Sequence, residues 1–151
     1  MTFRENIDKE ELAEYPVSGF EGEILLVDDN SKLEESVNIL KSYSVIGFDT
    51  ETRPSFRKGR KNRVALLQLA SAEKAFLFRI NNIGLPGELI DILADDSITK
   101  VGVAIHDDIK GLRSISNFKE GGFIELQNFG HVFGIESSGL RKLSAIILGF
   151  R

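Results

Sequence analysis

The stretch that decides the fold reads Val45-Ile46-Gly47-Phe48-Asp49-Thr50-Glu51-Thr52. Its first half is apolar and favours a β-strand, and two carboxylates follow at positions i and i+2. On a strand this spacing places both side chains on one face, roughly 6.6–6.8 Å apart along the chain. Two bare carboxylates at the end of a buried strand would repel each other and lose solvation. A divalent cation removes both objections, and a solvated strand end is the alternative.

A carboxylate-bound metal is also what the composition allows. The 151 residues include no cysteine, which excludes a thiolate site, and only two histidines, His106 and His131, which does not favour a His-rich zinc site. Oxygen ligands favour Mg²⁺ or Mn²⁺. Pairs of such ions, about 3.5–4 Å apart, recur in phosphodiester chemistry. Any metal bound here is therefore expected to be Mg²⁺ or Mn²⁺, and a pair of such ions would suit the two acids.

The size and composition are those of one ordinary globular domain. Apolar residues make up 42% of the chain and charged residues 28%, which excludes a disordered or membrane-spanning protein. The first residues, MTFRENIDKEEL, are charged and contain no apolar core of a signal peptide. We therefore expect a cytoplasmic protein with no membrane segment. The sequence leaves the oligomeric state open.

Positive charge is concentrated in one segment, although the formal net charge is −4. Between Arg53 and Arg63 there is no acidic residue, and the segment directly follows the carboxylate pair. Its six basic residues are Arg53, Arg57, Lys58, Arg60, Lys61 and Arg63. Most such runs are solvated loops, but this position favours contact with the phosphates of a nucleic acid.

The order of apolar segments predicts an α/β fold with a mixed β-sheet flanked by α-helices. Residues 1–21 are expected to form an N-terminal arm, and residues 22–151 the main domain. Ser31 and Glu34 have the spacing of a helix capping box. Predicted strands are 23–27, 45–52, 64–70, 75–78, 99–104 and 123–126, and predicted helices are 31–43, 86–95, 139–149 and a helix that opens at His106.

Three segments together resemble the DEDD superfamily of 3'-5' exonucleases, above all its ribonuclease D and Werner-syndrome exonuclease branch. The first segment is residues 45–52, where an apolar strand ends in D-x-E. The second is Val64–Leu69 with its partner strand Ala75–Phe78. The third is Lys100–Asp108 followed by Leu112, which matches a strand, a helix start and a D-x-x-x-L motif. The resemblance implies a ribonuclease H-like fold.

The resemblance also implies roles for individual residues. Asp49, Glu51 and Asp108 would be catalytic and would bind the metals, with Asp107 as the second choice for the third acid. Asp107 alone is also explained as an acid that favours a helix N-terminus. Residues expected to contact the substrate are Thr50, Thr52, Arg57, Lys58, Arg60 and Lys61.

One motif of the family is absent from the sequence. Its last motif is a helix with Y-x-x-x-D or H-x-x-x-D, and neither Tyr15 nor Tyr43 is followed by aspartate four residues later. We therefore expect a 3'-5' exonuclease domain that lacks its C-terminal helices, so that this chain is impaired. Its expected partner is single-stranded or 3'-ended nucleic acid, either DNA or RNA. The expected products are nucleoside 5'-monophosphates. The alternative is a non-catalytic nucleic-acid-binding module with a vestigial site.

Overall fold

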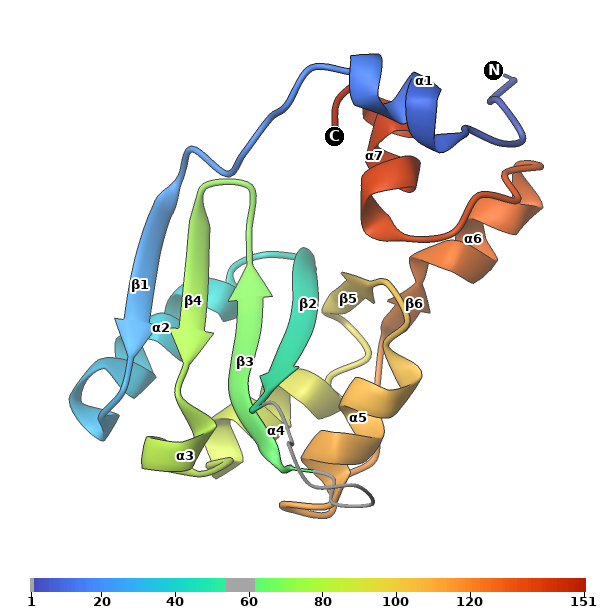
Figure 1. Ribbon diagram of the computed structural model, residues 1–151. Coiled ribbons are helices and arrows are strands. Elements are labelled where there is room, and N and C mark those ends of the chain that lie inside the picture. Colours follow the sequence, from blue (N-terminus) through green and yellow to red (C-terminus); the bar gives the residue numbers. More distant parts are fainter. Residues whose placement is uncertain (1, 54–61) are drawn as a thin grey trace. The chain divides into compact units, whose positions relative to one another are not determined.

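The computed structural model describes residues 2–53 and 62–151, and these form two compact units. One unit is Gly22–Ile124, which contains the β-sheet (Figure 1). The other joins Met1–Glu21 to Glu125–Arg151. In the part of the chain that the structure describes, no helix is long and apolar enough to cross a membrane.

The described residues form a six-stranded mixed sheet with the order β1-β4-β3-β2-β5-β6, which confirms the predicted fold class (Figure 1). Strand β1 pairs parallel to β4, and β2 pairs parallel to β5. Strand β3 pairs antiparallel to both β4 and β2. The strands are β1 Glu23–Val27, β2 Val45–Thr52, β3 Val64–Ala70, β4 Lys74–Phe78, β5 Thr99–Gly102 and β6 Phe123–Glu125.

Helices α2, α4 and α5 of the sheet-containing unit form where the apolar periodicity predicts helices, but one predicted cap differs. The predicted Ser31–Glu34 capping box does not form. Instead Asp29 accepts a hydrogen bond from the Ser31 backbone N–H at 2.7 Å, and a 3₁₀ turn precedes the helix. The elements are η1 Asn30–Lys32, α2 Leu33–Lys41, α3 Ile80–Ile83, α4 Gly87–Ala94 and α5 His106–Arg113. No helix was predicted for the segment that forms α3.

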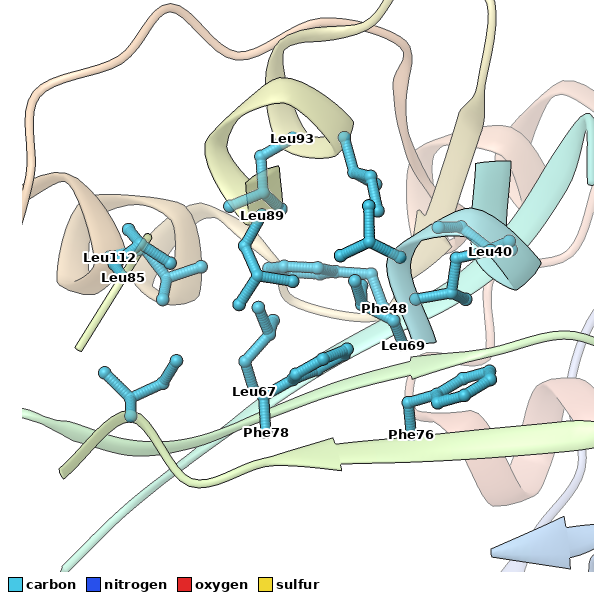
Figure 2. Packing of buried hydrophobic residues seen from close by; sticks show 14 of the residues in the cluster. Leu40, Phe48, Leu67, Leu69, Phe76, Phe78, Leu85, Leu89, Leu93 and Leu112 are labelled. Atoms are coloured by element: carbon cyan, nitrogen blue, oxygen red, sulfur yellow. The ribbon is translucent and has the colours of Figure 1, made fainter. Parts of the chain in front are cut away.

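The main core lies between one face of the sheet and helices α2 and α4. Strand alternation directs Leu67, Leu69, Phe76 and Phe78 to this face, where each is at most 1% exposed. Figure 2 shows these side chains packed with Leu40 of α2 and with Leu89 and Leu93 of α4. Burying one such side chain contributes about 1.5–3 kcal/mol. This face holds the strands in place, so the opposite face is available for polar groups.

A lysine lies in the interior of this unit, a feature that periodicity did not predict. Lys100 on β5 is fully buried, and its Nζ donates to the carbonyls of Asp95 at 2.6 Å and Ile98 at 2.7 Å. The ammonium also lies 5.2 Å from the centre of the Phe123 ring. Burial lowers the pKa of Lys100, and the nearby carboxylates Asp95 and Asp96 oppose that shift. The lysine therefore satisfies carbonyls where the chain passes from α4 to β5.

The second unit is built from helices α1 Lys9–Glu14, α6 Leu126–Val132 and α7 Leu140–Leu148. The Ile7 backbone N–H donates to Ser137 Oγ at 3.1 Å, which ties the N-terminal segment to the residues before α7. The Arg151 backbone N–H donates to the Pro16 carbonyl at 2.9 Å. Helix α7 was predicted, and it ends at Gly149, whose φ of 78° is the left-handed conformation that glycine adopts readily. Helices α1 and α6 were not predicted.

Candidate active site

Strand β2 presents its two carboxylates as the spacing predicts, and its observed bounds are the predicted ones. Ile46, Phe48 and Thr50 are buried, whereas Asp49 and Glu51 are exposed. The side chains of the two acids therefore share the face opposite the main core. Pairing with β3 shifts register between Glu51 and Thr52, so the strand is irregular directly after the second acid. Such irregularities are frequent next to active sites, where they redirect side chains.

Strand β5 approaches β2 so closely that only glycine fits at position 102. A Cβ atom there would lie 2.6 Å from the Phe48 carbonyl oxygen and 2.5 Å from Ile105 Cγ2. Two residues later Ala104 has φ 58°, a backbone conformation that is unusual for a residue with a side chain. The chain then enters α5 at His106. This tight turn carries the first residues of α5 to the end of β2.

The third predicted acid, Asp108, lies next to strand β2, which carries the first two. Asp108 lies in the first turn of α5 and is partly buried. Its Oδ1 accepts a short hydrogen bond from the hydroxyl of Thr50, the residue between Asp49 and Glu51. Asp49 in turn accepts the Thr50 backbone N–H at 2.9 Å. Residues far apart in sequence thus join β2 to α5.

Burial and like charge act on both aspartates. Burial raises the pKa of the Asp49 carboxyl group; the hydrogen bond from the Thr50 backbone opposes the shift, and Glu51 adds to it. Burial also raises the pKa of Asp108. The Thr50 hydroxyl opposes that shift, and the charges of Asp49 and Asp107 add to it. Among the described residues, the neighbouring charges that shift the pKa values of these two carboxyl groups are therefore all negative.

Oxygen donors with unbalanced negative charge are the chemistry that Mg²⁺ and Mn²⁺ select, so the donor set fits such a cation. The carboxylates are not yet gathered around one point. Among residues 2–53 and 62–151, no three acidic or histidine side chains form a ready-made metal site. The fit is thus one of chemistry and of neighbouring positions, and the side chains would have to turn toward a bound ion.

The structure separates the remaining predicted site residues. Asp107 is exposed in the first turn of α5, a position that the helix dipole favours. Thr52 is exposed at the end of β2, while the side chain of Thr50 is buried and directed to Asp108 rather than to the face of the two acids. The expected substrate contacts Arg57, Lys58, Arg60 and Lys61 lie outside the described residues.

A basic surface on α5 was not predicted. His106, Lys110 and Arg113 recur at helical spacing, a signal that the sequence already contained. They border two neighbouring hollows of about 520 and 340 Å³. Arg113 forms an ion pair with Glu120 at 3.1 Å, the sole acid in the described lining of either hollow. Among the described residues, the two hollows are lined by His106, Ile109, Lys110, Arg113, Asn117, Phe118, Lys119 and Glu120.

Comparison with known proteins gives this geometry its context. Residues 24–151 match the 3'-5' exonuclease family, a range that includes β2, α5 and all three predicted acids. The chain belongs to the 3'-5' exonuclease family. The match confirms the resemblance inferred from the D-x-E strand and the D-x-x-x-L helix.

Individual relatives agree with the assignment. The mouse bifunctional 3'-5' exonuclease/ATP-dependent helicase WRN is 35% identical over 117 residues, which are 74% of this chain and 8% of the mouse protein. The EXD2 exonuclease domain soaked in Mg and GMP is 26% identical, with a TM-score of 0.66 over 85% of this chain and 71% of that one. Trypanosoma brucei RNase D in complex with RNA U12 is 25% identical, with a TM-score of 0.64 over 74% of this chain and 40% of that one. This 3'-5' exonuclease chain thus spans a small part of its curated relative.

Proposed function

We propose that this chain is the catalytic domain of a metal-dependent 3'-5' exonuclease that shortens DNA or RNA from the 3' end. The proposal rests on the match of residues 24–151 to the family, together with the hydrogen bond that joins Asp108 to Thr50, the residue between Asp49 and Glu51. Released products would be nucleoside 5'-monophosphates. The proposal extends to a cytoplasmic location, with nucleic acid as the partner.

In the proposed chemistry the three acids bind the metal ions from two elements of the fold. Asp49 and Glu51 would hold Mg²⁺ or Mn²⁺ from strand β2, and Asp108 would hold it from α5, with two ions as the full complement. When bound, the ions supply positive charge that activates water and stabilises the leaving 3'-oxygen. The backbone of β2 fixes two of the carboxylates, because the main core locks the opposite face of the same strand. Without the ions, burial raises the pKa of Asp49 and of Asp108, and the charges of neighbouring carboxylates add to both shifts.

Substrate contacts are proposed on the two basic parts of the chain. The segment from Arg53 to Arg63 adjoins the carboxylates in sequence, and its Arg57, Lys58, Arg60 and Lys61 would bind phosphates, with Thr52 nearer the 3' end. On the described part of the chain, the basic surface of α5 adds Lys110 and Arg113, and the segment after that helix adds Lys119.

The sequence contains three of the four acids that the family motif expects, so we propose that turnover by this chain is slow. Loss of a ligand that stabilises the transition state can reduce the rate by several orders of magnitude, since each 1.4 kcal/mol is about tenfold. A high enzyme concentration is therefore needed in any assay.

The experiment compares a linear single-stranded oligonucleotide with a circular one of the same sequence, each with Mn²⁺ or with EDTA. We expect mononucleotides from the linear strand with Mn²⁺ and none from the circle, because an exonuclease needs a free end. Cleavage of the circle would contradict an exonuclease. Tight binding of both strands without cleavage in Mn²⁺ would favour the non-catalytic binding module instead.

A further inference from the structure

We propose that Thr50 is a positioning residue: its hydroxyl restrains one oxygen of the Asp108 carboxylate beside β2, so that a bound divalent cation can draw in the other oxygen with less loss of side-chain freedom. The inference rests on the proposed function, because it assigns Asp108 to the metal. It concerns the middle residue of the Asp49-Thr50-Glu51 run, whose side chain points away from its two neighbours.

The location of Thr50 explains why its hydroxyl is committed to one partner. Its side chain lies on the inner face of β2, is 8% exposed, and sits opposite Leu67 in the register with β3. A buried hydroxyl that donates to nothing would lose solvation without compensation. Here it donates to Asp108 Oδ1, which lies 58 residues later in the sequence.

The bond from Thr50 matters because its acceptor, Asp108, is one of the proposed metal ligands. A hydrogen bond to an ionised carboxylate is shorter and stronger than one between neutral groups. Because Oδ1 is tied to Thr50, rotation of the carboxyl group is restricted, and the other oxygen remains to meet a cation. The same bond joins β2 to α5, so the backbone that carries Asp49 and Glu51 also fixes Asp108. Partners that orient metal ligands in this way typically change metal affinity by about 10–100-fold when removed.

Threonine suits the position in both of its substituents. A β-branched side chain is favoured on a strand and restricts its own χ1 rotation, which keeps the hydroxyl directed at α5. Valine has nearly the same shape but no donor, and serine keeps the donor but lacks the methyl group. The pair Thr50→Val and Thr50→Ser therefore separates hydrogen bonding from packing.

The test measures Mn²⁺ affinity by electron paramagnetic resonance or calorimetry, with unfolding midpoints of the same samples. Thr50→Val is expected to weaken Mn²⁺ binding by about 10–100-fold. Thr50→Ser is expected to remain within about threefold of wild type. The control is Thr99→Val on β5, a partly buried strand threonine outside the site, which should leave Mn²⁺ affinity unchanged.

The outcomes distinguish failure of the proposed Thr50 role from failure of the proposed exonuclease function. The inference is overturned when folded Thr50→Val binds Mn²⁺ as tightly as wild type, or when Thr50→Ser loses as much affinity as Thr50→Val. If Thr50→Val does not fold, the serine variant still decides, because loss of affinity by folded Thr50→Ser contradicts the role of the hydroxyl. Wild-type protein that binds Mn²⁺ and cuts, beside a Thr50→Val variant that does the same, leaves the exonuclease proposal intact. Wild-type protein that binds no Mn²⁺ overturns both.

Discussion

Gly102→Ala tests whether the close approach of β5 to β2 sets the position of the catalytic strand. The added Cβ would lie 2.6 Å from the Phe48 carbonyl oxygen, where ordinary contact begins near 3.4 Å. The φ angle of Gly102 is not in the left-handed region, so the conflict is one of space alone. A backbone carbonyl cannot rotate away, and therefore the two strands must separate. Phe48 directly precedes Asp49, so the separation moves the acid.

The magnitude follows from the size of the conflict. Forcing an extra carbon into a well-packed site costs about 1–3 kcal/mol. In a chain of this length, 1 kcal/mol lowers the unfolding midpoint by about 2–4 °C. We therefore expect Gly102→Ala to unfold about 2–12 °C below wild type, with loss of nuclease activity at temperatures where it remains folded.

The assay is thermal and urea unfolding of three proteins: wild type, Gly102→Ala and Gly47→Ala. Gly47 is the matched control, because it lies on β2 itself and a Cβ there would meet the Ala70 carbonyl oxygen at 3.7 Å, an ordinary contact. The free energy of unfolding of Gly47→Ala should lie within about 1 kcal/mol of the wild-type value, since alanine loses less backbone entropy on folding than glycine. Equal stability of Gly102→Ala and wild type would refute the close approach.

Three further substitutions have defined outcomes. Burial raises the pKa of Asp108 in the folded protein, so the ionised carboxylate destabilises the metal-free fold at pH values above that pKa. Asp108→Asn should therefore raise the unfolding midpoint at pH 7. The difference from wild type should disappear as the pH falls through the raised pKa. A midpoint at pH 7 no higher than wild type would argue against the shift. Lys100→Met leaves the carbonyls of Asp95 and Ile98 without their donor and should lower the free energy of unfolding by about 1–3 kcal/mol; a more stable variant would mean that burial of the charge outweighs these bonds. Leu67→Ala should lower the free energy of unfolding in urea by about 2–5 kcal/mol, because Leu67 is fully buried at the centre of the sheet, and a loss below 1 kcal/mol would contradict that packing.

The strands could be predicted from sequence because their patterns depend on the main core. Residues 45–52 alternate between buried and exposed side chains, and the strand has the predicted bounds. Strand β3 also has its predicted bounds, with Leu67 and Leu69 fully buried. Helices α1 and α6, which contribute no side chain to the main core, were not predicted. Helix α1 is six residues long and contains no buried residue, so it carries no apolar stripe to detect.

The site was predictable to the level of residue type and order, but not of contact. The spacing of Asp49 and Glu51 gave their common face, and family resemblance gave Asp108. The hydrogen bond between Thr50 and Asp108 joins residues 58 positions apart, and no local pattern encodes it. The buried Lys100 was missed for a similar reason, since its acceptors are carbonyls, which every residue has. The end of β5 at Gly102, two residues before the predicted end, follows from the turn at Ala104.

The central claim is tested most directly by digestion of a 5'-labelled single strand with Mn²⁺, using wild type and Asp49→Ala at equal, high concentration. Asp49→Ala removes a carboxylate from the exposed face of β2, where no core packing depends on it. We predict a ladder that shortens from the 3' end with wild type, dependent on Mn²⁺, and no ladder with Asp49→Ala. Full-length strand in both reactions, or a ladder that survives Asp49→Ala, would contradict the assignment of catalysis to this site.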